Sequence, residues 1–252
     1  MSAAEGSAAA ADGIVLRELR TPDEMRAVVD LQWQTWGQED STPANQLIVS
    51  VKIGGHVLGA FDGPRLVGFA YAFPAVLPGR EPWLQSHMLA TRRGYDGRGI
   101  GRRLKWLQRD WALARGFHRI TWTFDPLEAR NAHLNLNVLG ATAPEYVVNC
   151  YGDMDDRLNR GLPSDRLVAS WDLESERVAL ARAGHLGVPR GEGVERVGVP
   201  RDLQALKADS LARAMTERLR VRDALRTLMA RGLVVSGFDR EACALVLTPG
   251  AS

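Results

Sequence analysis

Residues 95–101, Tyr95-Asp96-Gly97-Arg98-Gly99-Ile100-Gly101, contain three alternating glycines and indicate the fold. A β-strand is predicted just before them at 83–91, and a helix is predicted after them at about 99–115. Glycine lets a backbone turn its N–H groups toward a phosphate, and the first N–H groups of a helix have no partner within that helix. The stretch therefore predicts an anion-binding loop between a strand and a helix.

Basic side chains crowd around this loop, although the net charge of the chain is only +2. A solvated helix face is the ordinary explanation for such a run of charge. A diphosphate bound at the loop would explain the glycines and the arginines together, whereas the small net charge predicts neither a nucleic-acid nor a membrane partner. The basic residues concerned are Arg92, Arg93, Arg98, Arg102, Arg103, Lys105 and Arg109.

Two common nucleotide-binding loops do not fit the stretch. A Walker loop ends in Gly-Lys-Ser/Thr, and this one continues as Gly101-Arg102-Arg103. A dinucleotide fingerprint needs a glycine three residues after Gly99, where this chain has Arg102, and it needs a βαβ unit with a ribose-binding acid. The ligand of the loop is therefore not predicted to be a nucleotide of either class.

Outward from the loop, alternating and helical apolar patterns predict a mixed α/β sheet. Thr21-Pro22 followed by Glu24 predicts a capped helix start, and Asp62-Gly63 predicts a hairpin turn. The expected strands lie at 14–19, 55–61, 65–73, 83–91, 118–124 and 146–151, and the expected helices at about 21–36, 44–53, 99–115 and 131–139.

The composition divides the chain into four expected parts. An Ala-rich leader without Lys or Arg occupies 1–13 and is expected to be disordered, and the main domain follows at 14–176. A Gly-, Ala- and Arg-rich linker is expected at 177–193, before a C-terminal α+β extension at 194–252. The extension is predicted to hold a strand at 195–199, a helix at 202–231 broken near Asp209-Ser210, and strands at 233–238 and 242–247.

Composition also bounds the class of protein. The 252 residues are 45% hydrophobic and 25% charged, which is typical of a soluble globular protein, and no apolar run reaches the ~18 residues of a membrane span. Cys150 and Cys243 lack metal-ligand spacing and are expected to be buried thiols in a cytoplasmic protein. No metal site is predicted.

Asp96-x-x-Gly99-Ile100-Gly101 resembles motif A of the GNAT acyltransferases, which binds the pyrophosphate of acyl-CoA. Residues 88–91 resemble the family's fourth strand, and Asn131 with Gly140-Ala141 resembles its motif B. The resemblance covers about 14–152. It implies a GNAT fold, with a mostly antiparallel central sheet, splayed strands 4 and 5, and the C-terminal extension. It also implies a CoA site made of Leu89, Ala90, Thr91, Asp96, Gly97, Arg98, Gly99, Ile100, Gly101, Arg102 and Asn131.

Two positions depart from the family pattern. Asp96 stands where Arg or Gln is usual, so its carboxylate is expected to point away from the phosphates or to cap the helix. Leu136 stands where many members have the tyrosine that protonates the leaving thiolate. Tyr146 or Tyr151 is a substitute donor, or the thiolate leaves unassisted.

A narrower resemblance extends the match over most of the chain. Residues 122–127, 131–133, 149–154 and 161–166, with Trp171, look like a GNAT subgroup found alongside N-acylamino acid racemases. That resemblance implies N-acylation of an amino acid, with succinyl-CoA as a donor beside acetyl-CoA. Other readings stay open: protein or peptide N-acetylation, and a non-catalytic acyl-CoA sensor. The oligomeric state is also left open, with a homodimer as one alternative.

Acyl transfer to an amine needs a general base and a donor to the carbonyl oxygen. His87, on the strand at 83–91, has a suitable side chain for the base, although a hydrogen-bonded strand histidine is the plain alternative. Asp125 is a second candidate, to orient the ammonium or accept a proton through water, or else to cap the turn after it. The backbone N–H of Leu89 or Ala90 is the expected oxyanion donor.

Recognition of the amine substrate is assigned to two side chains. Ser86 precedes His87 on the same strand. Arg166 is a candidate clamp for a substrate carboxylate, with a turn contact to Asp165 as the equal alternative. His133 is expected to be structural.

Overall fold

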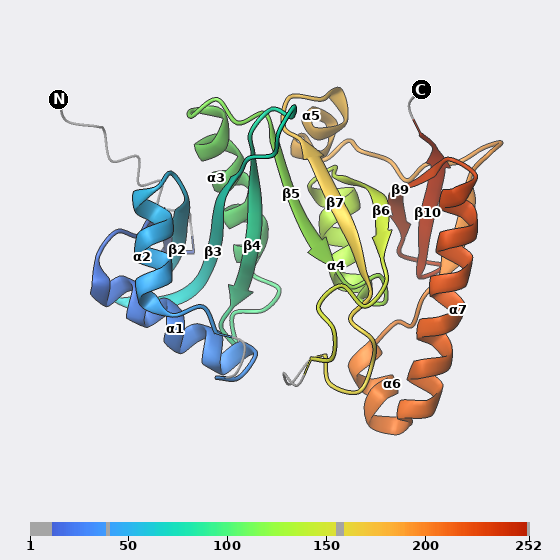
Figure 1. The fold of residues 1–252 in the computed structure, drawn as a ribbon, viewed down its shortest axis with the longest axis horizontal. Coiled ribbons are helices and arrows are strands. Elements are labelled where there is room, and N and C mark those ends of the chain that lie inside the picture. Colours follow the sequence, from blue (N-terminus) through green and yellow to red (C-terminus); the bar gives the residue numbers. More distant parts are fainter. Residues whose placement is uncertain (1–11, 39–40, 155–158, 251–252) are drawn as a thin grey trace. The chain divides into compact units, whose positions relative to one another are not determined.

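The computed structural model describes residues 12–38, 41–154 and 159–250 (Figure 1). Residues 1–11 of the predicted leader therefore lie outside the described residues. The chain divides into two compact units, residues 1–120 and 121–252.

The first unit is built on four antiparallel strands in sequence order: β1 (Ile14–Glu18), β2 (His56–Asp62), β3 (Arg65–Ala75) and β4 (Trp83–Thr91). The hairpin predicted at Asp62-Gly63 is confirmed, and Gly63 has a φ of +54° that suits glycine. All four strands were predicted to within two residues at each end, because their apolar side chains repeat at strand spacing.

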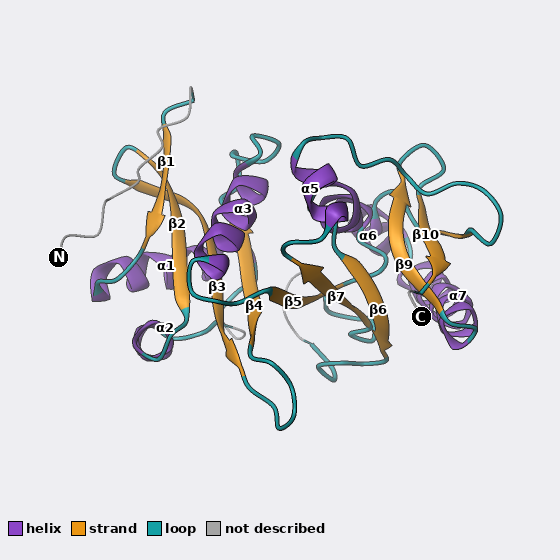
Figure 2. Ribbon diagram, turned by 90° about the horizontal axis from the view of Figure 1, so that it is seen from above, coloured by secondary structure: helices purple, strands orange, loops and turns teal. Residues whose placement is uncertain are grey.

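Helices cover both faces of this sheet, as Figure 2 shows. On one face, α1 (Pro22–Thr35) and α2 (Ala44–Lys52) pack over Phe69 and Tyr71 of β3. On the other face, α3 (Ile100–Leu113) packs its Ile100 and Leu104 against Gly68 of β3, where a side chain at position 68 would collide with them. Side chains of β3 alternate between the two helical layers, which is why nearly the whole strand is apolar.

The start of α1 is the predicted one. The hydroxyl of Thr21 accepts a hydrogen bond from the backbone N–H of Glu24, and the Glu24 carboxylate accepts from the N–H of Thr21 in return. This capping box satisfies two N–H groups that have no partner within the helix. Because Pro22 begins the helix, no further donor is lost there.

The second unit contains the rest of β5 (Arg119–Phe124), with β6 (Thr142–Val147), β7 (Arg166–Asp172), β8 (Glu195–Gly198), β9 (Leu233–Asp239) and β10 (Ala244–Pro249). Their order is β5-β7-β6-β9-β10-β8, and the pairs from β7 to β8 are antiparallel. Its helical elements are α4 (Ala129–His133), the π-helix η1 (Leu134–Val138), α5 (Glu176–Arg182), α6 (Leu203–Asp209) and α7 (Leu211–Ala230).

Three expectations for this unit were wrong in part. The strand expected at 146–151 is β6, which ends at Val147, because Asn149 takes a left-handed φ of +47° in a turn. The stretch expected as a linker from residue 177 contains most of α5, whose N-terminus is capped by the hydroxyl of Ser175 and which buries Val178 and Ala181. The helix expected at 131–139 is α4 followed by the π-helix.

The break predicted near Asp209-Ser210 is confirmed. Ser210 is extended, with φ −158° and ψ 109°, and its hydroxyl caps α7 by accepting from the N–H of Arg213. Cys243 is buried as expected, but Cys150 is only half-buried. None of the described helices is both long enough and apolar enough to cross a bilayer.

Candidate functional site

The predicted anion-binding loop ends at the N-terminus of α3. Gly99 is the N-cap, so the N-cap residue has no side chain with which to cap the helix. Gly97 and Gly99 have φ values of +77° and +72°, and a Cβ on either would meet no described atom within 4 Å. Because the glycines leave this space empty and the helix N-terminus carries partial positive charge, the loop fits a diphosphate.

The neighbouring arginines are held in different ways. Arg103 donates to the carboxylate of Asp12 at 3.1 Å and to the carbonyl of Ile14 at 2.7 Å. The Arg98 guanidinium lies 3.9 Å from the Asp12 carboxylate and over the ring of Tyr95. Arg102 is exposed to solvent. A phosphate that binds these three arginines would therefore have to replace different existing contacts in each case.

Asp96 is exposed and lies three residues before Gly99, so it is not itself the N-cap residue of α3. Ile100 buries its side chain under β3, so only its backbone N–H is available to a ligand. A Cβ on Gly101 would approach Leu89 and Thr91 at 3.7 and 4.0 Å, which places these two β4 side chains beside the first turn of α3.

Strand β4 carries a β-bulge at the middle of the predicted site. Tyr71 pairs with Met88 while the next residue, Ala72, pairs with Ser86, so His87 is the extra residue. A bulge leaves one residue outside the ladder and redirects the strand, and such features are common beside active sites. Ala90 follows in the register opposite Phe69, with its side chain in the core on the α1 and α2 face.

His87 is accessible to solvent and lies against two aromatic rings. Its ring centroid is 5.9 Å from that of Tyr71 and 5.8 Å from that of Phe73. The partial loss of water in this surrounding lowers the pKa of His87 below its usual value. At neutral pH the imidazole is therefore uncharged and able to accept a proton.

Ser86 points away from the face that holds His87. Its hydroxyl is buried and accepts a hydrogen bond from Nζ of Lys105 at 3.1 Å, on the α3 side of the sheet. The expectation that Ser86 contacts the amine substrate is not supported by this orientation, and the serine instead belongs to a buried polar cluster.

Asp125, at the end of β5, is engaged by two arginines. Arg218 of α7 donates to its Oδ1 at 2.9 Å and also bonds to Oδ2, while Nη1 of Arg166 lies 3.7 Å from Oδ2. The same carboxylate accepts from the backbone N–H of Leu127 at 2.8 Å. This geometry matches the turn-capping alternative for Asp125 and leaves a carboxylate that is poorly placed to accept a proton.

Arg166 belongs to the same buried group of charges. Besides Asp125 it contacts Asn159, whose side-chain oxygen accepts at 2.8 Å, and the carbonyl of Asp165 at 2.9 Å. Asp165 is fully buried and accepts two hydrogen bonds from Arg222 of α7 at 2.7 and 2.9 Å. The turn contact expected between Asp165 and Arg166 is thus present, within a larger network.

The structure locates Leu136 and the two tyrosines that are candidate proton donors to the leaving thiolate. Leu136 is fully buried in the π-helix. The hydroxyl of Tyr146 donates to Asp165 at 2.6 Å, and burial together with this bond raises its pKa well above the usual value. The hydroxyl of Tyr151 lies 2.7 Å from that of Thr123, on a half-exposed side chain. Of the two tyrosines, Tyr151 is the better placed to exchange a proton with a ligand.

Asn131 is exposed on α4, and His133 lies 3.2 Å from the side chain of Asn137. Asn137 in turn bonds both ways with the backbone of Phe238 in β9, at 2.7 and 2.9 Å. His133 therefore adjoins a packing contact, in keeping with its expected structural role.

Sequence reasoning missed two clusters. One joins Lys105 and Gln108 of α3 to His56 of β2, and the other contains Arg218 and Arg222 of α7. Lys105, Gln108 and Ala112 recur at helical spacing on the buried side of α3, which is a signal that the apolar stripe alone does not reveal. The two arginines are four residues apart and face one side of α7.

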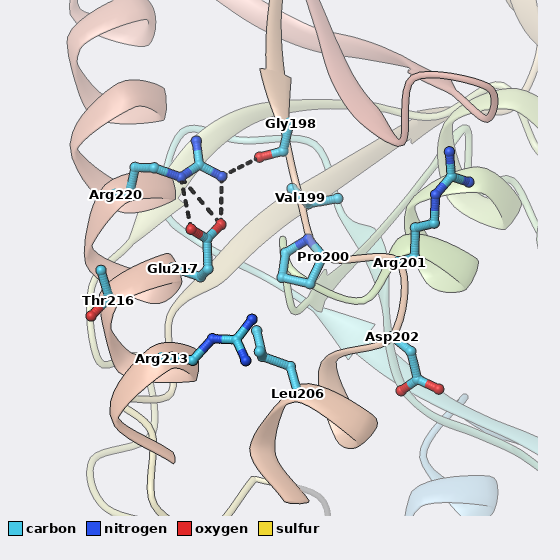
Figure 3. A pocket seen from close by; sticks show the side chains of 10 residues that line it. All are labelled: Gly198, Val199, Pro200, Arg201, Asp202, Leu206, Arg213, Thr216, Glu217 and Arg220. Atoms are coloured by element: carbon cyan, nitrogen blue, oxygen red, sulfur yellow. Dashed lines mark hydrogen bonds and ion pairs between the residues drawn. The ribbon is translucent and has the colours of Figure 1, made fainter. Parts of the chain in front are cut away.

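A cavity of about 700 Å³ lies between residues 198–206 and α7 (Figure 3). Its arginines are already engaged: Arg220 bonds to Glu217 and to the carbonyl of Gly198, Arg201 to the carbonyl of Glu241, and Arg213 to Asp209. None of the predicted site residues lines it. Among the described residues, no three His, Cys, Asp or Glu side chains are grouped as metal ligands.

Comparison with known proteins points to one family. Residues 23–136 match the family model described as Acetyltransferase (GNAT) family. No curated protein sequence matches the chain.

Several solved structures share the fold at low sequence identity. A GNAT-family protein from Desulfovibrio desulfuricans is 16% identical, with a TM-score of 0.50, over 64% of this chain and 99% of that one. The ribosomal-protein-S18-alanine N-acetyltransferase of Escherichia coli is 15% identical, with a TM-score of 0.51, over 64% and 95%. The yncA protein of Salmonella typhimurium, solved with acetyl-CoA, is 15% identical, with a TM-score of 0.52, over 65% and 95%.

Proposed function

We propose that this chain is an acyl-CoA N-acyltransferase of the GNAT family, whose acetyltransferase domain is matched by residues 23–136. It moves an acetyl or succinyl group from CoA to the amino group of a small molecule, an amino acid in particular. One observation carries the proposal. The N-cap of α3 is a glycine, and a Cβ on Gly97 or Gly99 would meet no described atom within 4 Å, so the backbone at this helix N-terminus is open to a ligand.

The loop supplies the grip on the donor. Backbone N–H groups from Gly97 to Arg102 hold the diphosphate, with Arg98 and Arg102 adding charge. Asn131, Leu89, Ala90 and Thr91 are the further contacts that we assign to the CoA moiety. The yncA relative, which was solved with acetyl-CoA, supports this class of donor.

The chemistry needs an uncharged amine next to the thioester. His87 accepts the proton of the substrate ammonium, and the freed lone pair attacks the carbonyl carbon. The backbone N–H of Leu89 or Ala90 donates to the carbonyl oxygen, whose charge grows as the new C–N bond forms. The C–S bond then breaks, and the thiolate takes a proton from Tyr151 or leaves unassisted.

The acceptor is the least constrained part of the proposal. Arg166 supports an acceptor or donor with a carboxylate, because a guanidinium can bind a carboxylate through two hydrogen bonds. Arg166 and Arg218, which are both buried, share the single carboxylate of Asp125, so a second anion would meet an excess of positive charge there. We further propose a cytoplasmic enzyme, and a homodimer that sedimentation would detect.

The deciding experiment measures thiol release from acetyl-CoA and from succinyl-CoA against a panel of amino acids and N-terminally free peptides. Turnover confined to amino acids supports the proposal. Turnover confined to peptides would assign the chain to protein N-acetylation, the activity named for the E. coli relative.

A second candidate is a non-catalytic acyl-CoA sensor, which Leu136 favours because it removes the usual proton donor. Calorimetry separates it from the enzyme. Micromolar binding of acetyl-CoA with no turnover on any amine would replace the transferase by the sensor, and no binding at all would overturn both.

A further inference from the structure

Three buried residues form a row across the sheet of the first unit, on the face that α3 covers. His56 of β2 pairs with Ala72 of β3, and Ala72 pairs with Ser86 of β4. His56 and Ala72 are fully buried, and Ser86 is 4% exposed. The middle residue has only a methyl group, so two polar side chains are separated by a gap.

Side chains of α3 fill that gap and join the two ends of the row. Nζ of Lys105 donates to Oγ of Ser86 at 3.1 Å and to Oε1 of Gln108 at 2.7 Å. Nε2 of Gln108 lies 3.0 Å from Nε2 of His56. A continuous hydrogen-bonded bridge therefore runs from β2 to β4 above Ala72.

The bridge is an unusual use of core space. Lys105 is 2% exposed, and burial lowers its pKa well below the usual value. In the described chain, Nδ1 of His56 has no hydrogen-bond partner, which adds to the cost. Apolar side chains of similar volume would fill such a site at least as stably, so stability alone does not explain the polar residues.

The position of the bridge explains why these core residues are polar. It ends on Ser86, which is the last residue of β4 in the ladder before the bulge at His87. A bulge leaves one residue outside the ladder and bends the strand, so fixing Ser86 fixes the point from which the strand departs. Past the bulge, Leu89 and Ala90 supply the backbone N–H groups that we assign to the thioester carbonyl.

We propose that Lys105 is a positioning residue for acyl transfer, which acts through Ser86 to hold the β4 bulge and thereby to place His87 and the N–H groups that follow it. The role in transfer rests on the proposed function. The mechanical part, that Lys105 holds the bulge, does not.

The kinetic experiment compares Lys105→Met with Ser86→Ala and with the double variant. Each single variant should lower kcat by about 10- to 100-fold, as a displacement of about 1 Å at a reacting centre does. The Kd for CoA should stay within about twofold, and the double variant should be no worse than either single one. Lys52→Met, on the exposed end of α2, is the control.

Amide hydrogen exchange tests the mechanical part without any turnover. In Lys105→Met, the amides of residues 86–90 should exchange at least tenfold faster, while those of β1 should be unchanged. Lys105→Gln, which can still donate to Ser86, should restore protection in part. If the wild-type protein turned over no amine, the proposed function would be wrong. The exchange experiment would still decide whether Lys105 holds the bulge.

The pH dependence of unfolding gives a third readout. His56 is the second titratable member of the bridge, and the charged groups near it include Arg115 after α3 and Glu18 of β1, which is bonded to Trp111. Because burial lowers the pKa of Lys105, the folded state binds this proton more weakly than the unfolded state does, and the folding constant rises with pH over the range between the lowered pKa and about pH 10.5. Lys105→Met should lose that slope. An unchanged kcat together with unchanged exchange in Lys105→Met would overturn the inference.

Discussion

The carboxylate of Asp12 lies 3.1 Å from Nη1 of Arg103, in the first turn of α3, and 3.9 Å from Nη2 of Arg98. An acidic group of the N-terminal segment thus occupies two of the cations beside the glycine loop. Desolvation acts to raise the pKa of Asp12, but the hydrogen bond from the backbone N–H of Ile14 and, after it, the charge of Arg103 hold that pKa below its usual value. A phosphate at the loop would compete with this carboxylate for the same guanidinium groups.

Asp12→Asn should therefore strengthen the binding of CoA. The pair is exposed, so the gain in affinity should be about two- to fivefold and should fade as salt is raised. Titration calorimetry at two ionic strengths measures it. Asp23→Asn removes an exposed ion pair with Arg26 on α1 and is the matched control, with unchanged affinity. Weaker binding in Asp12→Asn would mean that the aspartate supports the site.

Gly99→Glu should abolish CoA binding while the protein stays folded. The substitution puts a side chain on a residue with a left-handed φ, and it adds a carboxylate. Both changes oppose binding, but only the carboxylate would repel a phosphate. Gly116→Glu is the control, because Gly116 has a similar φ of +78° and equally open surroundings at the far end of α3. Each variant should cost about 1 kcal/mol in unfolding free energy. Equal CoA affinity in the two variants would place the diphosphate elsewhere.

His87→Gln should lower kcat by about 100-fold with little change in the Kd for CoA, as expected for loss of a general base. The pKa of His87 lies below its usual value, so the base form persists as the pH falls. The acid limb of kcat/KM in the wild type should accordingly have its midpoint below about pH 6.5. Gln85→Ala, two residues earlier on β4, is the comparison variant. A flat profile in the wild type would remove His87 as the base.

His56 should make the first unit sensitive to acid. Burial lowers its pKa to about 3, so the folded state excludes a proton that the unfolded state takes up below about pH 6.5. Its stabilisation is complete above pH 6.5 and is lost as the pH falls toward 3, on the order of 2 kcal/mol by pH 5. Urea unfolding against pH measures this. His56→Gln should reduce the slope of the curve between pH 5 and 6.5, and the exposed His185→Gln should not.

Asp125 and Arg218 should behave as a structural pair. Arg218 is 1% exposed and in the described chain its Nε has no partner, so Asp125→Ala strands a buried cation and should cost about 3–5 kcal/mol in unfolding free energy. Asp125→Leu combined with Arg218→Met should recover much of that loss. Activity per folded molecule should recover with it. A stable double variant that remains inactive would show that Asp125 takes part in the chemistry.

The features predicted well from sequence are local ones. The capping box at Thr21 and the hairpin at Asp62-Gly63 depend on residues within a few positions of each other, and both were found as predicted. The glycine loop is local in the same way, because φ near +70° at Gly97 and Gly99 is a property of those residues alone.

The features that were missed depend on contacts between distant residues. Asp125 and Arg218 are 93 positions apart, and Ser86 meets Lys105 only because α3 packs over β4. At the π-helix, Arg177 donates from its guanidinium to the carbonyls of Leu136 and Gly140 at 3.0 Å each, across about 40 positions of sequence. The short helix α5 offers only two buried positions, too few to give a periodic signal.

The methyl group of Ala72 sets a rule that related sequences can be expected to obey. Any larger side chain there would enter the volume that Lys105 and Gln108 cross on their way between His56 and Ser86. Relatives with valine or leucine at this position should carry aliphatic residues at 105 and 108, whereas relatives that retain alanine should retain the lysine. Correlated substitution between position 72 and the distant pair 105 and 108 would then report the bridge wherever it occurs.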